Sequence, residues 1–126
     1  MPHTERPKIA HLEDNEGDNI LLRKTLKDMA DIQHFYSFQE MQNAPKDFDL
    51  IITDLGLPDV YGTETLIALR DKFGQIPILA LTGLGGAFIT GDEVRAMMDA
   101  GADNVVSKDL IRDRRMITLI KQLLNE

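Results

Sequence analysis

Cysteine is absent from this 126-residue sequence, and so is tryptophan. Without cysteine, neither a disulfide framework nor a thiolate metal site is available, which suits a reducing compartment. No apolar run approaches the length of a membrane-spanning helix, and the polar N-terminal stretch Met1–Pro7 lacks the pattern of a signal peptide. We therefore expect a cytoplasmic protein with no membrane insertion.

Positive charge is also scarce. The chain has 14 Lys and Arg residues against 21 Asp and Glu residues, so its formal net charge is −7. An acidic protein is repelled by nucleic acid phosphates and by anionic lipids. We therefore expect no direct nucleic acid partner.

Short apolar runs alternate with helical patterns along the chain. The runs typical of strands lie at residues 8–12, 32–36, 50–53, 78–81 and 104–107. The helical patterns lie at 17–29, after Ser37, at 63–73, from Thr90 with Val94, Met97 and Met98 facing inward, and at 113–125. This alternation predicts an α/β fold: a doubly wound, five-stranded parallel sheet with helices on both faces. We expect residues 1–7 to form a flexible tail and residues 8–126 to form the domain.

Polar side chains follow several of the predicted strands directly. Glu13 and Asp14 follow the first strand, Asp54 the third, Thr82 the fourth and Lys108 lies just after the fifth. In an open parallel sheet, ligands bind beyond the carboxyl ends of the strands, where the winding reverses. Each residue alone has an ordinary explanation, because acids cap helices and surface hydroxyls and ammonium groups are solvated. Their joint placement at one edge of the sheet predicts a site.

The clustered carboxylates of this predicted site indicate a bound cation, because like charges repel unless a positive charge joins them. Mg²⁺ is commonly held by one or two carboxylates together with water and phosphate oxygens. Beside such an ion, Asp54 can stay ionised and attack phosphorus, since aspartyl phosphate is an established covalent intermediate. Lys108 can supply further positive charge to the phosphoryl oxygens, and Thr82 can donate a hydrogen bond to one of them.

The segment Asp54–Gly62, which reads DLGLPDVYG, resembles the phosphoacceptor segment of response regulator receiver domains. The Glu13–Asp14 pair, Thr82, Gly101–Asp103 and Lys108 are similar to the other marks of that family and occur in the same order. The resemblance covers nearly the whole chain, and it implies the strand order 2-1-3-4-5.

The resemblance also implies the residues of the site. The phosphorylated residue would be Asp54. The Mg²⁺ ligands would be Asp14, Asp54 and the carbonyl group of Gly56, with Glu13 reaching the metal through water. The residues in contact with the phosphoryl group would be Thr82 and Lys108.

The same resemblance implies partners and an activity. The phosphoryl group would come from a histidine kinase or a histidine phosphotransfer protein, and phosphorylation would change binding to a downstream protein target. A further partner would be a second copy of the chain, in a homodimer that forms on phosphorylation. The chain would catalyse only its own phosphorylation and dephosphorylation, so we expect no turnover enzyme. With no output domain in the sequence, we expect a stand-alone receiver, with a domain excised from a larger protein as the alternative.

Three departures from the family pattern bear on how a signal is relayed. Val105 stands three residues before the lysine, where the family usually has Tyr or Phe, and Asp109 follows the lysine, where Pro is frequent. The stretch from Thr82 to Gly101 is several residues longer than is usual in the family. The extra length lies in Gly83–Gly91, which contains Phe88. Valine is too small and too stiff to replace a swinging aromatic ring. We expect a switch that involves Thr82, Val105 and Phe88, with static packing of Phe88 as the alternative.

Three other functions compete with this interpretation. A receiver-like module that binds partners without phosphorylation would not need the acid, Thr and Lys set. A Mg²⁺-dependent phosphohydrolase would place a second Asp two residues after the nucleophile, where this chain has Gly56. A flavodoxin-like cofactor carrier would cradle phosphate with its first loop, which here is the acidic stretch Glu13–Glu16.

Two further features of the sequence have structural explanations. His11 falls inside the first predicted strand, so we expect a packed and hydrogen-bonded side chain and no metal ligand. We assign the adjacent pair Met97 and Met98 to the core.

Overall fold

The computed structural model describes residues 6–57, 59–60, 62–82 and 91–125. The strands are β1 (Lys8–Leu12), β2 (Asp31–Phe35), β3 (Leu50–Asp54), β4 (Ile78–Thr82) and β5 (Asn104–Ser107). The helices are α1 (Glu16–Leu26), α2 (Phe38–Met41), α3 (Thr63–Phe73), α4 (Gly91–Ala100) and α5 (Arg114–Leu124), with a 3₁₀ helix η1 (Lys108–Arg112) after β5. Residues 1–5, for which we expect a tail, lie outside this description.

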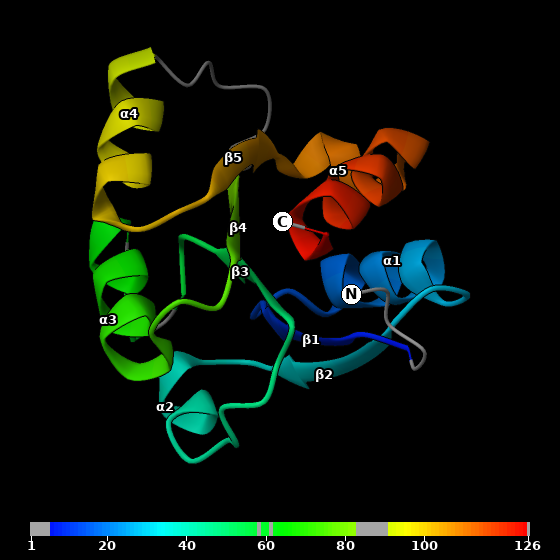
Figure 1. Ribbon diagram of the computed structural model, residues 1–126, viewed down its shortest axis with the longest axis horizontal. Coiled ribbons are helices and arrows are strands. Elements are labelled where there is room, and N and C mark those ends of the chain that lie inside the picture. The colour runs from blue at the N-terminus through cyan, green and yellow to red at the C-terminus, as the bar shows by residue number, and fades with distance from the viewer. Residues whose placement is uncertain (1–5, 58, 61, 83–90, 126) are drawn as a thin grey trace.

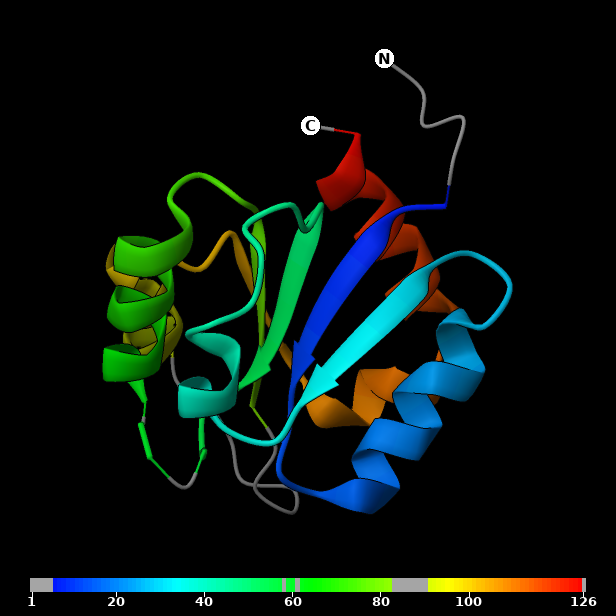
Figure 2. The same cartoon turned by 90° about the horizontal axis from the view of Figure 1, so that it is seen from below.

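The five strands form one sheet in the order β2-β1-β3-β4-β5, and all neighbouring pairs are parallel. Helices α1 and α5 cover one face of the sheet, and α2, α3 and α4 lie on the other face (Figure 1, Figure 2). Both the predicted fold class and the predicted strand order are confirmed. Because all strands run the same way, their carboxyl ends meet at one edge.

Two apolar layers hold the helices to the sheet. Successive residues of a strand point to opposite faces, so Ala10 and Leu12 enter the layer under α2 and α3, whereas Ile9 enters the layer under α1 and α5. Strand β3 is buried along its whole length, as a central parallel strand should be. The centre of the sheet is therefore packed on both faces, and the residues at its carboxyl edge follow directly from these packed strands.

Helix α1 ends at Leu26, three residues before the predicted end. The amide groups of Met29 and Ala30 both donate to the carbonyl oxygen of Leu26, which closes the helix in a turn. The guanidinium group of Arg6 then donates to the carbonyl oxygens of Lys27 at 2.6 Å and Ala30 at 2.8 Å. A residue distant in sequence therefore satisfies carbonyl groups of the turn that follows the helix, which no local pattern predicts.

The prediction that Met98 belongs to the core is wrong. Met98 is 45% exposed, whereas Met97 packs against the apolar layer under α3. Consecutive helical residues differ in direction by about 100°, so both members of a pair rarely face inward. Val94 is half-buried as expected, and Thr90 lies outside the part of the chain that the structure describes.

The segment after β3 is fixed at both ends. Gly62 adopts a positive φ of 62°, which favours glycine, and its amide group donates to the carbonyl oxygen of Leu55 at 2.7 Å. The carboxylate of Asp59 accepts hydrogen bonds from the amide groups of Phe38 and Gln39 at the start of α2. The bonds to Asp59 hold the loop that follows Asp54 against the start of α2.

No helix within the described ranges has both the length and the apolar character needed to cross a membrane.

Candidate active site

Three carboxylates gather at the carboxyl edge of the sheet. One oxygen each from Glu13, Asp14 and Asp54 lies within 4.8 Å of the others. Glu13 is fully buried, Asp54 is 9% exposed, and Asp14 is exposed to solvent. The acids come from the ends of β1 and β3, which are hydrogen-bonded neighbours, so the cluster follows directly from the sheet order.

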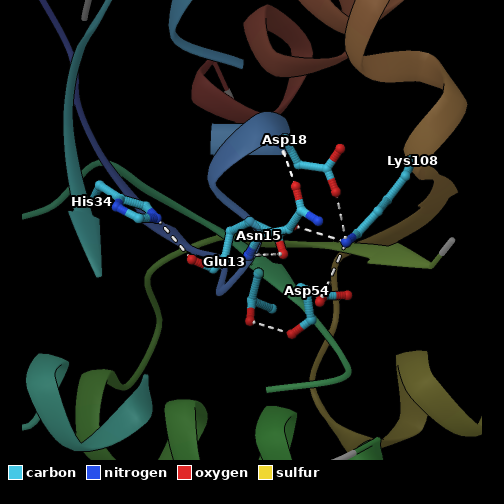
Figure 3. A network of polar contacts seen from close by, with 7 residues as sticks. Glu13, Asn15, Asp18, His34, Asp54 and Lys108 are labelled. Carbon is cyan, nitrogen blue, oxygen red and sulfur yellow. Dashed lines mark hydrogen bonds and ion pairs between the residues drawn. The ribbon is translucent and has the colours of Figure 1, made fainter. Parts of the chain in front are cut away.

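Lys108 reaches this cluster from the first residue of η1 (Figure 3). Its Nζ atom lies 2.9 Å from Glu13 Oε1, 3.3 Å from Asp54 Oδ2 and 3.1 Å from Asp18 Oδ2. The lysine side chain is 18% exposed. A single ammonium group thus stands among three carboxylates, two of which belong to the predicted site.

The charges of this group shift one another's proton affinity. Burial raises the pKa of Glu13 to about 7, with contact to Lys108 opposing the shift and the charge of Asp54 adding to it. Burial alone would lower the pKa of Lys108, but its contact with Glu13 and the charge of Asp54 raise that pKa well above the usual range. Lys108 is therefore charged near neutral pH, and Glu13 is costly to ionise without a further cation nearby.

The donor set fits a hard divalent cation. Carboxylate oxygens are the protein ligands that Mg²⁺ prefers, and the three acids are close enough for their oxygens to approach one ion. A Cβ atom built on Gly56 would lie 3.8 Å from Asp54 Oδ2, so the backbone of Gly56 borders the same carboxylate. A cation bound there would offset the repulsion among the acids and attract phosphate oxygens.

Thr82 stands at the end of β4, beside the cluster. Its register partner on β5 is Ser107, and Asp54 pairs with Leu81, the residue just before Thr82. The Thr82 hydroxyl donates a long hydrogen bond of 3.5 Å to the carbonyl oxygen of Val106. The hydroxyl therefore has a weak partner on β5.

Val105 is half-buried and packs against the layer under α3. Phe88, the third residue of the predicted switch, lies in the segment 83–90, outside the described residues.

The His11 prediction is half wrong. The ring is fully buried as expected, but neither ring nitrogen has a hydrogen-bond partner among the residues described. Burial is the main cause that lowers the pKa of His11 to about 3; the neighbouring charge of His34 contributes to this shift, and the nearby Asn19 side chain opposes it. The ring is uncharged because it sits on the central strand β1 beneath α1, where water cannot solvate a charge.

Asp18 is the contact that sequence reasoning missed. It lies in the first turn of α1, where an acid is ordinary because it favours the positive end of the helix. Only the packing of α1 beside η1 brings it to Lys108, 90 residues away in the chain. No pattern in the sequence marks that proximity.

Comparison with known protein families identifies the family of this chain. The family model of the response regulator receiver domain matches residues 10–121 of the sequence. The chain belongs to the response regulator receiver domain family. The matched range includes all three clustered acids and Lys108.

Individual relatives agree with this assignment. The cell cycle response regulators CtrA of Brucella ovis and Brucella suis are 40% identical to this receiver domain over 67 residues. That match covers 53% of this chain and 27% of each relative, so it spans about a quarter of the curated relatives' length.

Solved structures show the same fold. The beryllofluoride-activated DrrB receiver domain superimposes with a TM-score of 0.82 at 20% identity, covering 97% of this chain and 100% of that chain. The signal receiver domain of a putative LuxO repressor protein from Vibrio parahaemolyticus gives a TM-score of 0.81 at 25% identity, covering 96% and 92%.

Family membership fixes the broad function. This chain is a receiver domain of two-component signalling, a signalling module and not a classical enzyme. Receiver domains generally bind Mg²⁺ in an acidic pocket and interact with histidine kinases and downstream effectors.

Proposed function

We propose that Asp54 accepts a phosphoryl group from a histidine kinase or a histidine phosphotransfer protein, and that this changes the binding of a downstream protein target. The observation that carries the proposal is the position of Lys108 Nζ, 3.3 Å from Asp54 Oδ2, beside three clustered acids. Asp54 is nearly buried at the end of a strand that is packed on both faces, which favours one orientation of its carboxylate for an in-line reaction.

The transfer step is a displacement at phosphorus. A carboxylate oxygen of Asp54 forms a bond to phosphorus while the bond from phosphorus to the donor nitrogen breaks. The electron pair of that bond returns to the donor imidazole, which leaves uncharged when its other nitrogen carries a proton. The charge that develops is spread over the phosphoryl oxygens, so positive charge around them lowers the barrier.

Each neighbour of Asp54 has a distinct part in this proposal. Lys108 binds a phosphoryl oxygen, and the Thr82 hydroxyl exchanges its long bond to β5 for a phosphoryl oxygen. Asp14, Asp54 and the carbonyl group of Gly56 would hold Mg²⁺, and Glu13 would reach it through water. The metal, when bound, supplies charge stabilisation to the phosphoryl oxygens.

The output of the switch is the binding of another protein. With Val105 in the place of an aromatic residue, we assign the relay to Thr82 and the segment Gly83–Gly91 with Phe88. A homodimer that forms on phosphorylation, and action in the cytoplasm, belong to the same proposal.

The phosphohydrolase alternative lacks its acid. Gly56 stands where that mechanism needs a second Asp, and it is exposed at the mouth of the cluster. The module that binds without phosphorylation remains the main competitor, and it predicts no covalent change at Asp54.

Intact mass measured after incubation with acetyl phosphate tests the proposal. One phosphoryl group should add to the parent in Mg²⁺ and not in EDTA, and Asp54→Asn should take up none. Asp71→Asn, which changes an exposed acid on α3, is the matched control and should be labelled like the parent. Equal labelling of Asp54→Asn and the parent would overturn the assignment of Asp54.

A further inference from the structure

Lys108 has more carboxylate partners than its predicted role requires. Its ammonium group has three donors, and three carboxylates lie within 3.3 Å of Nζ. Glu13 and Asp54 are two of them, and both belong to the acidic cluster. Asp18, the third, comes from the first turn of α1 (Figure 3).

The contact with Asp18 has the better hydrogen-bond geometry. Lys108 Nζ donates to Asp18 Oδ2 at 3.1 Å, whereas Glu13 Oε1 receives no hydrogen bond of good geometry from the described residues. Glu13 Oε2 instead accepts from the amide group of Asn15 at 3.1 Å. Glu13 Oε1 is the nearer oxygen at 2.9 Å, but among the described carboxylates only Asp18 combines a short distance with the alignment of a hydrogen bond to Lys108.

Glu13 and Asp54 belong to the acidic cluster that would bind the metal and the phosphoryl group, whereas the Asp18 carboxylate has no partner besides Lys108 among the described residues. Once a metal and a phosphoryl group are bound, the first two acids are engaged by them, so neither can be relied on to hold the lysine. Asp18 is 29% exposed and lies outside the cluster of possible metal ligands. It is the carboxylate left to hold Lys108 throughout the reaction.

Asp18 and Lys108 sit on two elements that are fixed to each other. The hydroxyl group of Thr25 on α1 donates to the carbonyl oxygen of Ile111 on η1 at 2.6 Å. The amide group of Asp18 donates to the side chain of Asn15, which caps the helix. The fold therefore fixes the separation of the two backbone positions, and the Asp18 carboxylate stays within reach of the Lys108 side chain.

We propose that Asp18 is a positioning residue for Lys108, holding its ammonium group at the edge of the acidic cluster so that one donor faces the phosphoryl group on Asp54. This inference rests on the proposed function. A lysine side chain has four flexible bonds, and fixing them in the transition state costs conformational entropy. An anchor restricts these bonds beforehand, so less entropy is lost during the reaction. The negative charge of Asp18 also repels the phosphoryl group, but solvent screens this partly exposed acid, and we expect positioning to dominate.

Nuclear magnetic resonance of the lysine ammonium groups tests the anchor without phosphorylation. With ¹⁵N-labelled lysine, an Nζ–Hζ signal is visible only when the ammonium protons exchange slowly with water, and Lys108→Arg assigns the signal. We expect it in the parent and in Asp18→Asn, which keeps an acceptor, and its loss in Asp18→Ala. Glu16→Ala removes an acid from the same helical turn that bonds Tyr36 instead, so it should keep the signal. A parent without the signal, or Asp18→Ala with it, would overturn the proposal.

Phosphorylation by acetyl phosphate in saturating Mg²⁺ tests the consequence. Asp18→Ala should react about tenfold more slowly, the rate equivalent of one net charge-assisted hydrogen bond, while Asp18→Asn recovers most of the rate and Glu16→Ala matches the parent. A rate in Asp18→Ala equal to or above the parent would show that Asp18 only repels the phosphoryl group. If the parent itself takes up no phosphoryl group, the proposed function fails, and the resonance signal still decides whether Asp18 holds Lys108.

Discussion

His34 hydrogen-bonds through Nε2 to the backbone carbonyl oxygen of Glu13 at 2.8 Å, which joins the edge strand β2 to the start of the acidic pair. A carbonyl oxygen only accepts, so Nε2 carries the proton in this contact. The amide group of Glu13 also donates to the carbonyl oxygen of Phe35 at 3.0 Å. Both polar groups of the Glu13 backbone are therefore bound to β2, and the direction in which Asp14 leaves the strand is fixed.

Removing this support should weaken the metal site without removing a ligand. We expect His34→Ala to lower the affinity for Mg²⁺ about tenfold, the lower range for groups that orient ligands. Titration with Mg²⁺ followed by amide chemical shifts measures this. Gln33→Ala, an exposed neighbour on the same strand, is the control and should bind as the parent does. An unchanged titration in His34→Ala would show that β2 does not position the acidic pair.

Loss of a predicted ligand should have a larger effect than loss of its support. Asp14→Ala removes an anionic oxygen from the three clustered acids, so most Mg²⁺ binding should disappear. Because Asp14 is exposed, the stability of the fold should change little, and the same titration can be read on a folded protein. Binding in Asp14→Ala equal to that of the parent would remove Asp14 from the ligand set.

The sequence predicts the site better than it predicts the surroundings of the site. Glu13, Asp54 and Lys108 each stand at or just after the end of a strand, so the strand order alone brings them together. Asp18 reaches Lys108 only because α1 packs beside η1, and such a contact has no sequence pattern. The exposure of Met98 likewise depends on how the helices pack on the sheet. So does the lack of a hydrogen-bond partner for the ring nitrogens of His11 among the described residues. The roles of the site residues stay predictions, and so does the domain boundary at Lys8.

The lifetime of the phosphorylated state should depend on Gly56. Hydrolysis needs a water molecule aligned with phosphorus, and a residue two positions after the acceptor could hold it. Gly56 has no side chain to do so, and Leu84, two residues after Thr82, offers no polar group. We therefore predict slow self-dephosphorylation, suited to a sustained signal or to onward transfer.

A polar side chain at this position should shorten that lifetime. The backbone of Gly56 has no positive φ, and an added Cβ would make an ordinary contact 3.8 Å from Asp54 Oδ2, so Gly56→Asn should fold normally. We expect its phosphoryl group to hydrolyse about tenfold faster, the rate equivalent of one net hydrogen bond to the attacking water. Gly56→Ala is the control for added volume and should match the parent. A phosphoryl half-life of seconds in the parent, unchanged in Gly56→Asn, would contradict the prediction.

His11 should make the fold sensitive to acid. Its pKa is lowered by burial to about 3, from 6.5 in an unfolded chain, so the unfolded state binds a proton in a range where the folded state does not. The full stability is therefore present above pH 6.5 and is lost as the pH falls from 6.5 toward 3. By linkage, the loss from this group reaches about 2 kcal/mol at pH 5.

Replacing the ring with an apolar side chain should remove this loss. His11→Leu removes two buried ring nitrogens that have no hydrogen-bond partner among the described residues, so we expect it to stabilise the fold at pH 8 by about 1 kcal/mol and at pH 5 by about 2 kcal/mol more. Urea unfolding in EDTA at both pH values measures the two differences from the parent. Leu12→Ala, which opens a cavity beside the same strand and carries no titrating group, should lose about the same free energy at both pH values. A difference between His11→Leu and the parent that stays constant from pH 8 to pH 5 would show that His11 takes up its proton in the folded protein, and that water reaches the ring beneath α1.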